Sequence, residues 1–213
     1  MFTIQYEEEI SIYVGDKELK GDLHIPAKCK GVVIFSHGSG SSRYSPRNKK
    51  VADYLFNKKI GTLLLDLLTV EEDMEYQNRF NIHLLTKRLI AATQWVQNTP
   101  VTLDCQIGYF GASTGAASAL SAASQIKGIK AVVCRGGRPD LTIQSLPFVK
   151  SPTLLLVGSL DTEVIKLNQV ALDALNCPKK LEIIYGAGHL FEAPGALDKV
   201  SFHAYKWFDT YFT

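Results

Sequence analysis

A serine lies between two glycines at the junction of an apolar run and a stretch of small residues. Residues 111–115 read Gly-Ala-Ser-Thr-Gly, with CQIGYF before them and the helix-like AASALSAAS after them. Such a strand–turn–helix setting projects the serine hydroxyl from a sharp turn, and the glycines let strand and helix approach closely. A hydroxyl held in this way is suited to nucleophilic attack. The alternative interpretation is that Ser113 simply caps the helix, a role that serine often fills.

Two further residues could activate this serine, whose hydroxyl is a weak nucleophile unless a base lies within hydrogen-bond reach. His189 ends the glycine-rich segment GAGH after the last apolar run and is the candidate base. Asp161 ends GSLD after another apolar run, where its carboxylate could orient the imidazole. The chain order Ser113, Asp161, His189 is the one expected for a serine on such a turn. The alternatives are an ordinary turn histidine and a helix-capping aspartate, with Glu163 as the rival acid.

Two backbone N–H groups are candidates for stabilising the oxyanion that this attack would create. The N–H of Thr114 directly follows the serine and lies at a predicted helix N-terminus, where the helix dipole favours negative charge. Ser39 belongs to the segment HGSG, residues 37–40, which follows another apolar run and would supply the second N–H. The two donors therefore come from different loops.

Arginines near the same loops indicate a possible substrate-binding role. Arg43 follows the HGSG loop and Arg135 closes an apolar run, so both could face the substrate. The planar guanidinium fork suits a carboxylate, which would indicate a substrate with an acidic group. The alternative is a loop brace or a surface salt bridge, for instance between Arg138 and Asp140.

A parallel sheet would bring these distant residues together, because the loops after its strands share one crevice. Nearly continuous apolar runs are typical of strands buried on both faces, and helical patterns lie between them. The apolar runs are 31–36, 61–68, 105–110, 130–135, 152–158 and 180–186, and the helical patterns are 47–58, 80–98, 114–125, 163–175 and 196–211. Alternating runs at 10–14 and 18–26 predict a hairpin through Gly15-Asp16.

This pattern predicts a single α/β domain over residues 1–213. Its architecture would be a mostly parallel, twisted sheet of about eight strands, with the hairpin as an antiparallel N-terminal addition. Helices would cover both faces. The sequence lacks the long insertions that form lids in lipases, so no large lid is expected.

With these motifs in place, the chain resembles the α/β-hydrolase superfamily, and within it the dienelactone-hydrolase-like group. The resemblance rests on HGSGSSR, GASTGAA, RGGRPD, GSLDTEV and GAGHLFEAPGAL, which span most of the chain. It implies an α/β-hydrolase fold with Ser113, Asp161 and His189 as the catalytic triad and Ser39 and Thr114 as the oxyanion hole. The enzymes that give the group its name use a cysteine nucleophile. The serine of this chain therefore implies general ester hydrolysis rather than a lactone substrate.

The composition argues against several other classes of protein. A net charge of +2 is too small to indicate nucleic acid or an anionic membrane as a partner. The cysteines lack the CxxC spacing of a zinc site and are expected to be reduced thiols. The N-terminus MFTIQYEEEI lacks the features of a signal peptide, and no apolar run reaches the about 20 residues of a membrane span. We expect a cytoplasmic protein without metal or cofactor.

The sequence as a whole predicts a cofactor-independent serine hydrolase, similar to the carboxylesterases, that cleaves an ester with a small or exposed acyl group. Ser113 would carry the acyl group, His189 would act as general base and acid, and Asp161 would orient the imidazole. The partner would be a small-molecule ester. The second hypothesis is a catalytically idle α/β-hydrolase scaffold that binds a small ligand or a protein, since a fold alone does not establish function.

Overall fold

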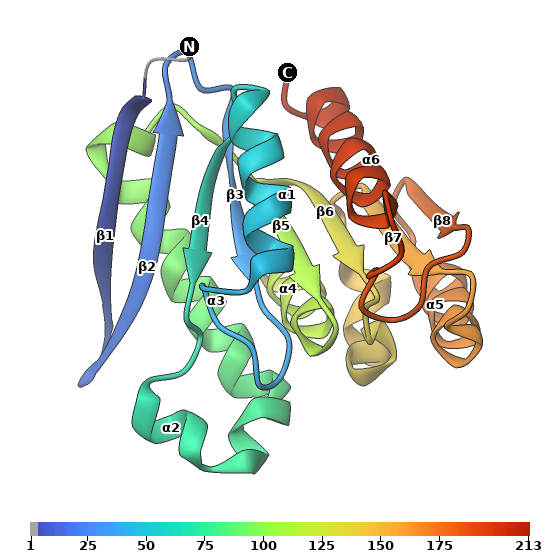
Figure 1. Cartoon of the computed structure of the whole chain (residues 1–213). Helices are drawn as coiled ribbons and strands as arrows, with labels where there is room; N and C mark the ends of the chain where they lie inside the picture. The colour runs from blue at the N-terminus through green and yellow to red at the C-terminus, as the bar shows by residue number, and fades with distance from the viewer. Residues whose placement is uncertain (1–3) are drawn as a thin grey trace.

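An eight-stranded sheet forms the centre of the computed structural model, which describes residues 4–213 (Figure 1). The strands are β1 (Ile4–Val14), β2 (Lys17–Pro26), β3 (Gly31–Ser36), β4 (Gly61–Leu65), β5 (Gln106–Ala112), β6 (Ile129–Arg135), β7 (Thr153–Gly158) and β8 (Lys179–Ile184). Their order is β1-β2-β4-β3-β5-β6-β7-β8. The pairs β1–β2 and β2–β4 are antiparallel, and the other pairs are parallel. The predicted mostly parallel sheet is confirmed.

Helices cover both faces of this sheet, as the sequence predicted. They are α1 (Pro46–Asn57), α2 (Val70–Met74), α3 (Ile82–Asn98), α4 (Thr114–Gln125), α5 (Thr162–Ala174) and α6 (Ala196–Tyr211), with the 3-10 segments η1 (Tyr76–Phe80), η2 (Pro100–Thr102) and η3 (Pro139–Phe148). Helices α1 and α6 pack on one face, and α3, α4 and α5 pack on the other (Figure 1). Each face therefore has its own hydrophobic core.

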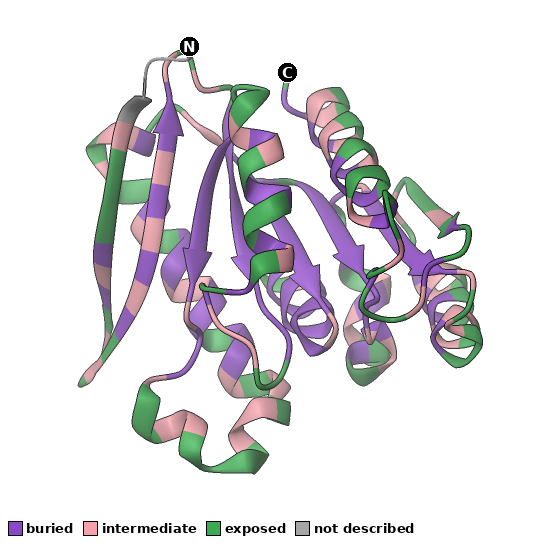
Figure 2. Ribbon diagram, in the orientation of Figure 1, coloured by how far each residue is buried: buried purple, intermediate pink, exposed green. Residues whose placement is uncertain are grey.

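The inner strands are buried on both sides, and successive residues belong to different cores. On β3, Val32 and Ile34 pack in the core under α3, α4 and α5, whereas Val33 and Phe35 pack in the core under α1 and α6. This division follows from the period of two in a strand, which turns alternate side chains to opposite faces. Figure 2 shows the resulting band of buried residues through the middle of the sheet. The apolar runs reflect this double burial.

The hairpin closes through the predicted two-residue turn. Val14 pairs with Lys17, which leaves Gly15 and Asp16 as the connection between β1 and β2. Gly15 has a φ of 64°, the left-handed conformation that such tight turns require. The hairpin is thus confirmed, and β2 joins it to β4 at the antiparallel end of the sheet.

Two short helical segments between β4 and α3 were not predicted from the hydrophobic pattern. Thr69 caps α2, because its hydroxyl accepts from the N–H of Glu72 while the Glu72 carboxylate accepts from the N–H of Thr69. This reciprocal capping box is readable in the sequence as Thr-x-x-Glu, so a local signal for the helix existed. Strand β4 ends at Leu65 rather than at residue 68, because the chain turns away toward this helix.

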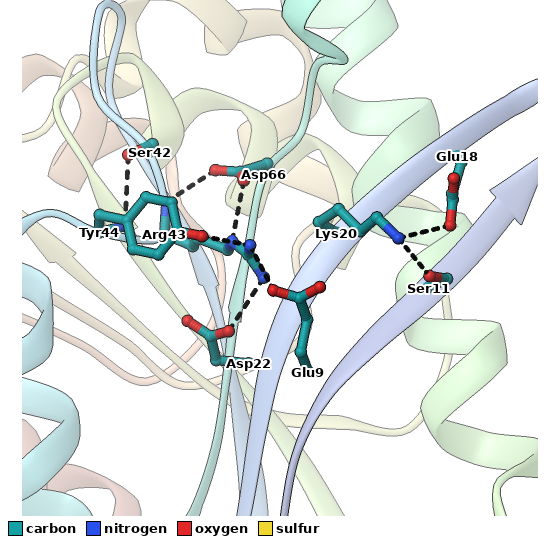
Figure 3. A network of polar contacts seen from close by, with 9 residues as sticks. All are labelled: Glu9, Ser11, Glu18, Lys20, Asp22, Ser42, Arg43, Tyr44 and Asp66. Carbon is teal, nitrogen blue, oxygen red and sulfur yellow. Dashed lines mark hydrogen bonds and ion pairs between the residues drawn. The ribbon is translucent and has the colours of Figure 1, made fainter.

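A buried arginine joins the hairpin to the loop after β3 (Figure 3). The Arg43 guanidinium forms ion pairs with Glu9 on β1 at 2.7 Å, Asp22 on β2 at 3.0 Å and Asp66 after β4 at 3.3 Å. The backbone N–H of Arg43 also donates to Asp66 Oδ1 at 2.8 Å. We correct here the expectation that Arg43 binds substrate, because these carboxylates already occupy its guanidinium.

Replacing Arg43 with methionine is expected to lower the free energy of unfolding by roughly 2–4 kcal/mol, because partly buried carboxylates lose their counter-charge. Urea denaturation measures this change. Lys20→Met is the matched control, because Lys20 pairs with Glu18 on the same hairpin at 2.6 Å, but both side chains are exposed. The control is expected to unfold at nearly the wild-type urea concentration. If the two variants lost the same free energy of unfolding, a structural role for Arg43 would be contradicted.

Candidate active site

A pocket of about 220 Å³ opens at the carboxyl ends of the parallel strands. Its lining includes Ser39 after β3, Ser113 after β5, Arg135 at the end of β6 and His189 after β8. Residues as far apart in the chain as Gly38 and Leu190 therefore meet in one small space. This is the edge at which parallel sheets place their ligands.

Ser113 occupies the turn between β5 and α4 in a strained backbone conformation. Its φ is 52° and its ψ is −122°, a combination that residues other than glycine seldom adopt. Ser113 stands at the N-cap position of α4, but its hydroxyl makes no capping hydrogen bond. The backbone is instead held by neighbouring strands and loops, since its N–H donates to Arg135 O at 3.2 Å and its carbonyl accepts from Arg138 N–H at 3.0 Å. The helix-cap interpretation of this serine therefore does not describe its side chain.

The glycines around Ser113 are required by close backbone contacts. A β-carbon at Gly115 would lie 2.1 Å from the carbonyl oxygen of Ser36, and one at Gly111 would lie 2.6 Å from the Cα of Ala116. Any larger residue would push α4 away from the ends of β3 and β5. The spacing of the glycines thus sets where the serine hydroxyl can be.

Asp161 and His189 form a direct hydrogen bond. The distance from His189 Nδ1 to Asp161 Oδ2 is 2.6 Å. Asp161 precedes α5 at the N-cap position without capping it through its side chain, so the carboxylate is available to the imidazole. Glu163 lies within α5 and pairs with Lys166 at 2.8 Å in an exposed position. The structure therefore brings Asp161, and not Glu163, to the histidine.

The imidazole of His189 is placed at the rim of the pocket beside Gly136. A β-carbon at Gly136 would lie 3.2 Å from the His189 carbonyl oxygen and 3.7 Å from its Cε1 atom. The His189 side chain is 41% exposed, whereas that of Asp161 is 16% exposed. Nδ1 is bound to the carboxylate, so Nε2 is the nitrogen left to act as a base toward Ser113 in the same pocket. Among residues 4–213, the Ser113 hydroxyl has no hydrogen-bond partner, and catalytic contacts often tighten only when substrate binds.

The two predicted oxyanion donors are neighbours, but one of them has a partner that the sequence did not indicate. The Ser39 N–H donates to the hydroxyl of Thr114 at 2.9 Å. A β-carbon at Gly38 would lie 2.9 Å from the Cβ of Ser113, so this loop passes directly beside the serine. An oxyanion would have to replace the Thr114 hydroxyl as the acceptor for Ser39.

His37 fixes the loop that carries Ser39. Its Nε2 accepts from the Leu67 N–H at 3.2 Å, and its Nδ1 lies 3.0 Å from the carbonyl oxygen of Gly38. This arrangement requires the proton on Nδ1, which donates to Gly38 O. Burial lowers the pKa of His37, in agreement with a neutral ring. His37 therefore orders the loop rather than transferring protons to the serine.

Two arginines line the pocket, and of these only Arg135 was expected there from the sequence. Arg135 is buried at the end of β6, and Arg47 lies in the first turn of α1. Arg138 forms the predicted pair with Asp140, at 2.8 Å. Arg47 could have been noticed from its place shortly after the HGSG loop, but the direction of its side chain depends on how α1 packs.

The side chains that could bind a metal ion do not form a cluster in the described part of the chain. Within residues 4–213, no group of three or more His, Cys, Asp or Glu side chains is arranged to hold a metal ion. The four cysteines are free, and burial raises the pKa of the Cys134 thiol on β6. In the same part of the chain, no helix has the length and apolar character needed to cross a membrane.

The sheet order and this pocket define a protein of the α/β-hydrolase class. The crystal structure of a dienelactone hydrolase from Anabaena variabilis ATCC 29413 is 50% identical to this chain, with a TM-score of 0.94. The match covers 97% of this chain and 98% of that one. The chain therefore belongs to the dienelactone-hydrolase-like group of the α/β hydrolases. Residues 90–185 also match the family described as BAAT / Acyl-CoA thioester hydrolase C terminal.

A more distant solved structure shares the fold. Est1E from Butyrivibrio proteoclasticus has a TM-score of 0.81 at 15% identity, covering 95% of this chain and 98% of that one.

Two Mycobacterium tuberculosis proteins, from strains CDC 1551 / Oshkosh and ATCC 25618 / H37Rv, carry the name "Putative phosphoribosyl transferase" and are 47% identical over 203 residues. The match covers 95% of this chain but 46% of each relative, so the chain spans about half of their length.

The strain at Ser113 leads to a prediction about stability. Ser113→Gly is expected to be more stable than Ser113→Ala by about 1–2 kcal/mol, because glycine adopts the observed φ without steric cost. This difference already allows for the greater freedom of glycine in the unfolded chain. Urea denaturation of the two variants, neither of which carries the hydroxyl, measures it. If alanine proved as stable as glycine, the turn would store no strain.

Proposed function

We propose that this chain is a serine hydrolase that cleaves carboxylic esters through an acyl-enzyme on Ser113. The observation that carries the proposal is the 2.6 Å hydrogen bond between His189 and Asp161, beside a pocket that also contains the strained serine. A bound Nδ1 leaves Nε2 as the base, and a carboxylate partner stabilises the imidazolium that forms during the reaction. Membership of the dienelactone-hydrolase-like group supports hydrolase chemistry.

The proposed reaction has two halves that use the same groups. The Ser113 oxygen attacks the ester carbonyl while His189 accepts the hydroxyl proton, and the tetrahedral intermediate then expels the alcohol, which takes that proton from His189. Water next attacks the acyl-enzyme with His189 again as base. The carboxylic acid leaves, and the proton returns to the Ser113 oxygen. Asp161 remains ionised throughout and orients the ring.

Backbone donors at Ser39 and Thr114 would hold the developing oxyanion. The Thr114 N–H lies at the N-terminus of α4, where the aligned peptide dipoles favour negative charge. The Ser39 N–H would move its hydrogen bond from the Thr114 hydroxyl to the oxyanion, which is the stronger acceptor because it is charged. The pocket volume of about 220 Å³ supports a small or partly exposed acyl group.

The competing hypothesis is an idle scaffold that binds a ligand without chemistry. The 2.6 Å hydrogen bond between His189 and Asp161 argues against it, because ligand binding alone does not require an oriented base beside a serine. The transferase name of the mycobacterial relatives belongs to chains about twice as long, and the serine–histidine–aspartate arrangement supports acyl chemistry rather than phosphoribosyl transfer. Hydrolysis therefore remains the better explanation of this pocket.

Labelling with a fluorophosphonate, followed by intact-mass measurement, tests the proposed nucleophile. Wild type is expected to gain a single adduct and Ser113→Ala none. Labelling of Asp161→Asn and His189→Ala is expected to be slower by roughly 100-fold or more, because the base loses its orientation or is absent.

Glu163→Gln is the matched control for Asp161→Asn, since it removes an acidic side chain two residues away that pairs with Lys166 at the surface. It is expected to label at the wild-type rate. A folded wild-type protein that gains no adduct would overturn the proposal in favour of the idle scaffold. An adduct that persists in Ser113→Ala would place the reactive serine elsewhere.

A further inference from the structure

Two of the four cysteines lie at the amino ends of neighbouring strands. Cys29 lies two residues before the start of β3, and Cys105 directly precedes β5. These strands are parallel partners, in which Gly31 pairs with Gln106. Their amino ends lie at the edge of the sheet opposite to the pocket of Ser113 (Figure 1). The two thiols are therefore separate from the proposed ester chemistry.

Both thiols border the same space. Cys29 and Cys105 are among the residues that line a cavity of about 270 Å³. Both are partly exposed, and both pack against the core under α3, α4 and α5. Adjacent strands are about 4.8 Å apart, and a disulfide joins Cα atoms separated by roughly 4.4–6.8 Å. The pairing of β3 with β5 therefore places the two cysteines at a separation that a disulfide can bridge.

The two thiols differ in how readily they ionise. A hydrogen bond with the Cys105 side chain is the main cause that lowers the pKa of Cys29 to about 7, and backbone contacts with Gly61 and Gly31 lower it further. The same hydrogen bond, together with burial, raises the pKa of Cys105. Near neutral pH, Cys29 is thus about half ionised while Cys105 holds its proton. A thiolate beside a thiol is the arrangement of a nucleophilic and a resolving cysteine.

The other two cysteines have different surroundings. Cys134 is fully buried on β6, and the thiol of Cys177 lies 3.7 Å from the hydroxyl of Thr153. Burial raises the pKa of both thiols. Within residues 4–213, Cys29 and Cys105 belong to no group of three side chains that could hold a metal ion. The pair is therefore better suited to oxidation than to metal binding.

We propose that Cys29 and Cys105 form an oxidation site that reacts with hydrogen peroxide and closes to a disulfide. The Cys29 thiolate attacks one peroxide oxygen, the O–O bond breaks, and hydroxide leaves and takes up a proton, so that Cys29 becomes a sulfenic acid. The Cys105 sulfur then attacks the Cys29 sulfur, the S–O bond breaks, and a second water leaves with the Cys105 proton. The two thiols lose two electrons, and the peroxide is reduced to two waters.

The first step prepares the second. The hydrogen bond and the negative charge of Cys29 help to keep the proton on Cys105. A sulfenic acid at Cys29 is neutral, so Cys105 ionises more readily once the peroxide has reacted. The disulfide would join, at their amino ends, the two strands whose carboxyl ends lead to Ser39 and Ser113. This inference does not depend on the reaction proposed for Ser113.

Mass spectrometry of the folded protein tests the pair. Wild type is reduced, freed of reductant and treated with hydrogen peroxide near neutral pH, and the remaining thiols are alkylated after denaturation. We expect the intact mass to fall by about 2 Da before alkylation, and only two of the four cysteines to be alkylated. Peptide mapping should find Cys29 joined to Cys105, and dithiothreitol should restore both thiols.

Single variants separate the two cysteines. Cys105→Ser lacks the resolving thiol, so peroxide should leave a sulfenic acid on Cys29 that dimedone traps. Cys29→Ser lacks the thiolate, so its first oxidation should be slower by roughly 10-fold or more. Cys177→Ser is the matched control, because Cys177 is also partly exposed but contacts a hydroxyl instead of a thiol. It should form the disulfide at the wild-type rate.

The same reaction in urea shows whether the fold brings the cysteines together. The disulfide between Cys29 and Cys105 should form at least roughly 10-fold faster in the folded protein, because the unfolded chain must first close a long loop. Equal rates in the two conditions would overturn the inference. So would a disulfide between two molecules, one that includes Cys134 or Cys177, or oxidation of wild type that yields no disulfide.

Discussion

The turn between β5 and α4 brings backbone against backbone, and the geometry of the pocket depends on that contact. Helix α4 starts so close to the end of β3 that a β-carbon at Gly115 would overlap the carbonyl oxygen of Ser36, at 2.1 Å. This approach forces Ser113 into its unusual conformation and lays the loop at Gly38 alongside it. The hydroxyl and the oxyanion donors are thus positioned by close packing of main chain, which is more rigid than contacts between side chains.

The buried arginines Arg43 and Arg135 lie in different electrostatic environments. Arg43 is surrounded by acidic groups and serves the framework, whereas Arg135 is left without one at the wall of the pocket. The neutral His37 holds the loop of Ser39 without adding charge. The charge of Arg43 is therefore neutralised within the framework, whereas the pocket lining that the structure describes keeps the positive charge of Arg135.

Local patterns in the sequence were sufficient for the strands, for the long helices and for the motifs on them. The apolar runs predicted the parallel strands, and Gly-Ala-Ser-Thr-Gly predicted the strained turn, because both depend on neighbouring residues. Arg43 and Arg135 look alike in the sequence, since Arg43 follows a strand and Arg135 ends one. They differ in the structure because the register of β1, β2 and β4 brings Glu9 and Asp22 to Arg43 alone. Such partners depend on tertiary packing, which a single sequence does not reveal.

The acidic partners of Arg43 come from three separate parts of the chain, at residues 9, 22 and 66. The network cannot form until the hairpin has closed and β2 has paired with β4, so it requires contacts between residues far apart in the sequence. Contacts of this kind are generally made late in folding. Interactions that are absent from the transition state act on the unfolding rate. We therefore expect the network to act mainly on the unfolding rate, and so to lengthen the lifetime of the folded molecule.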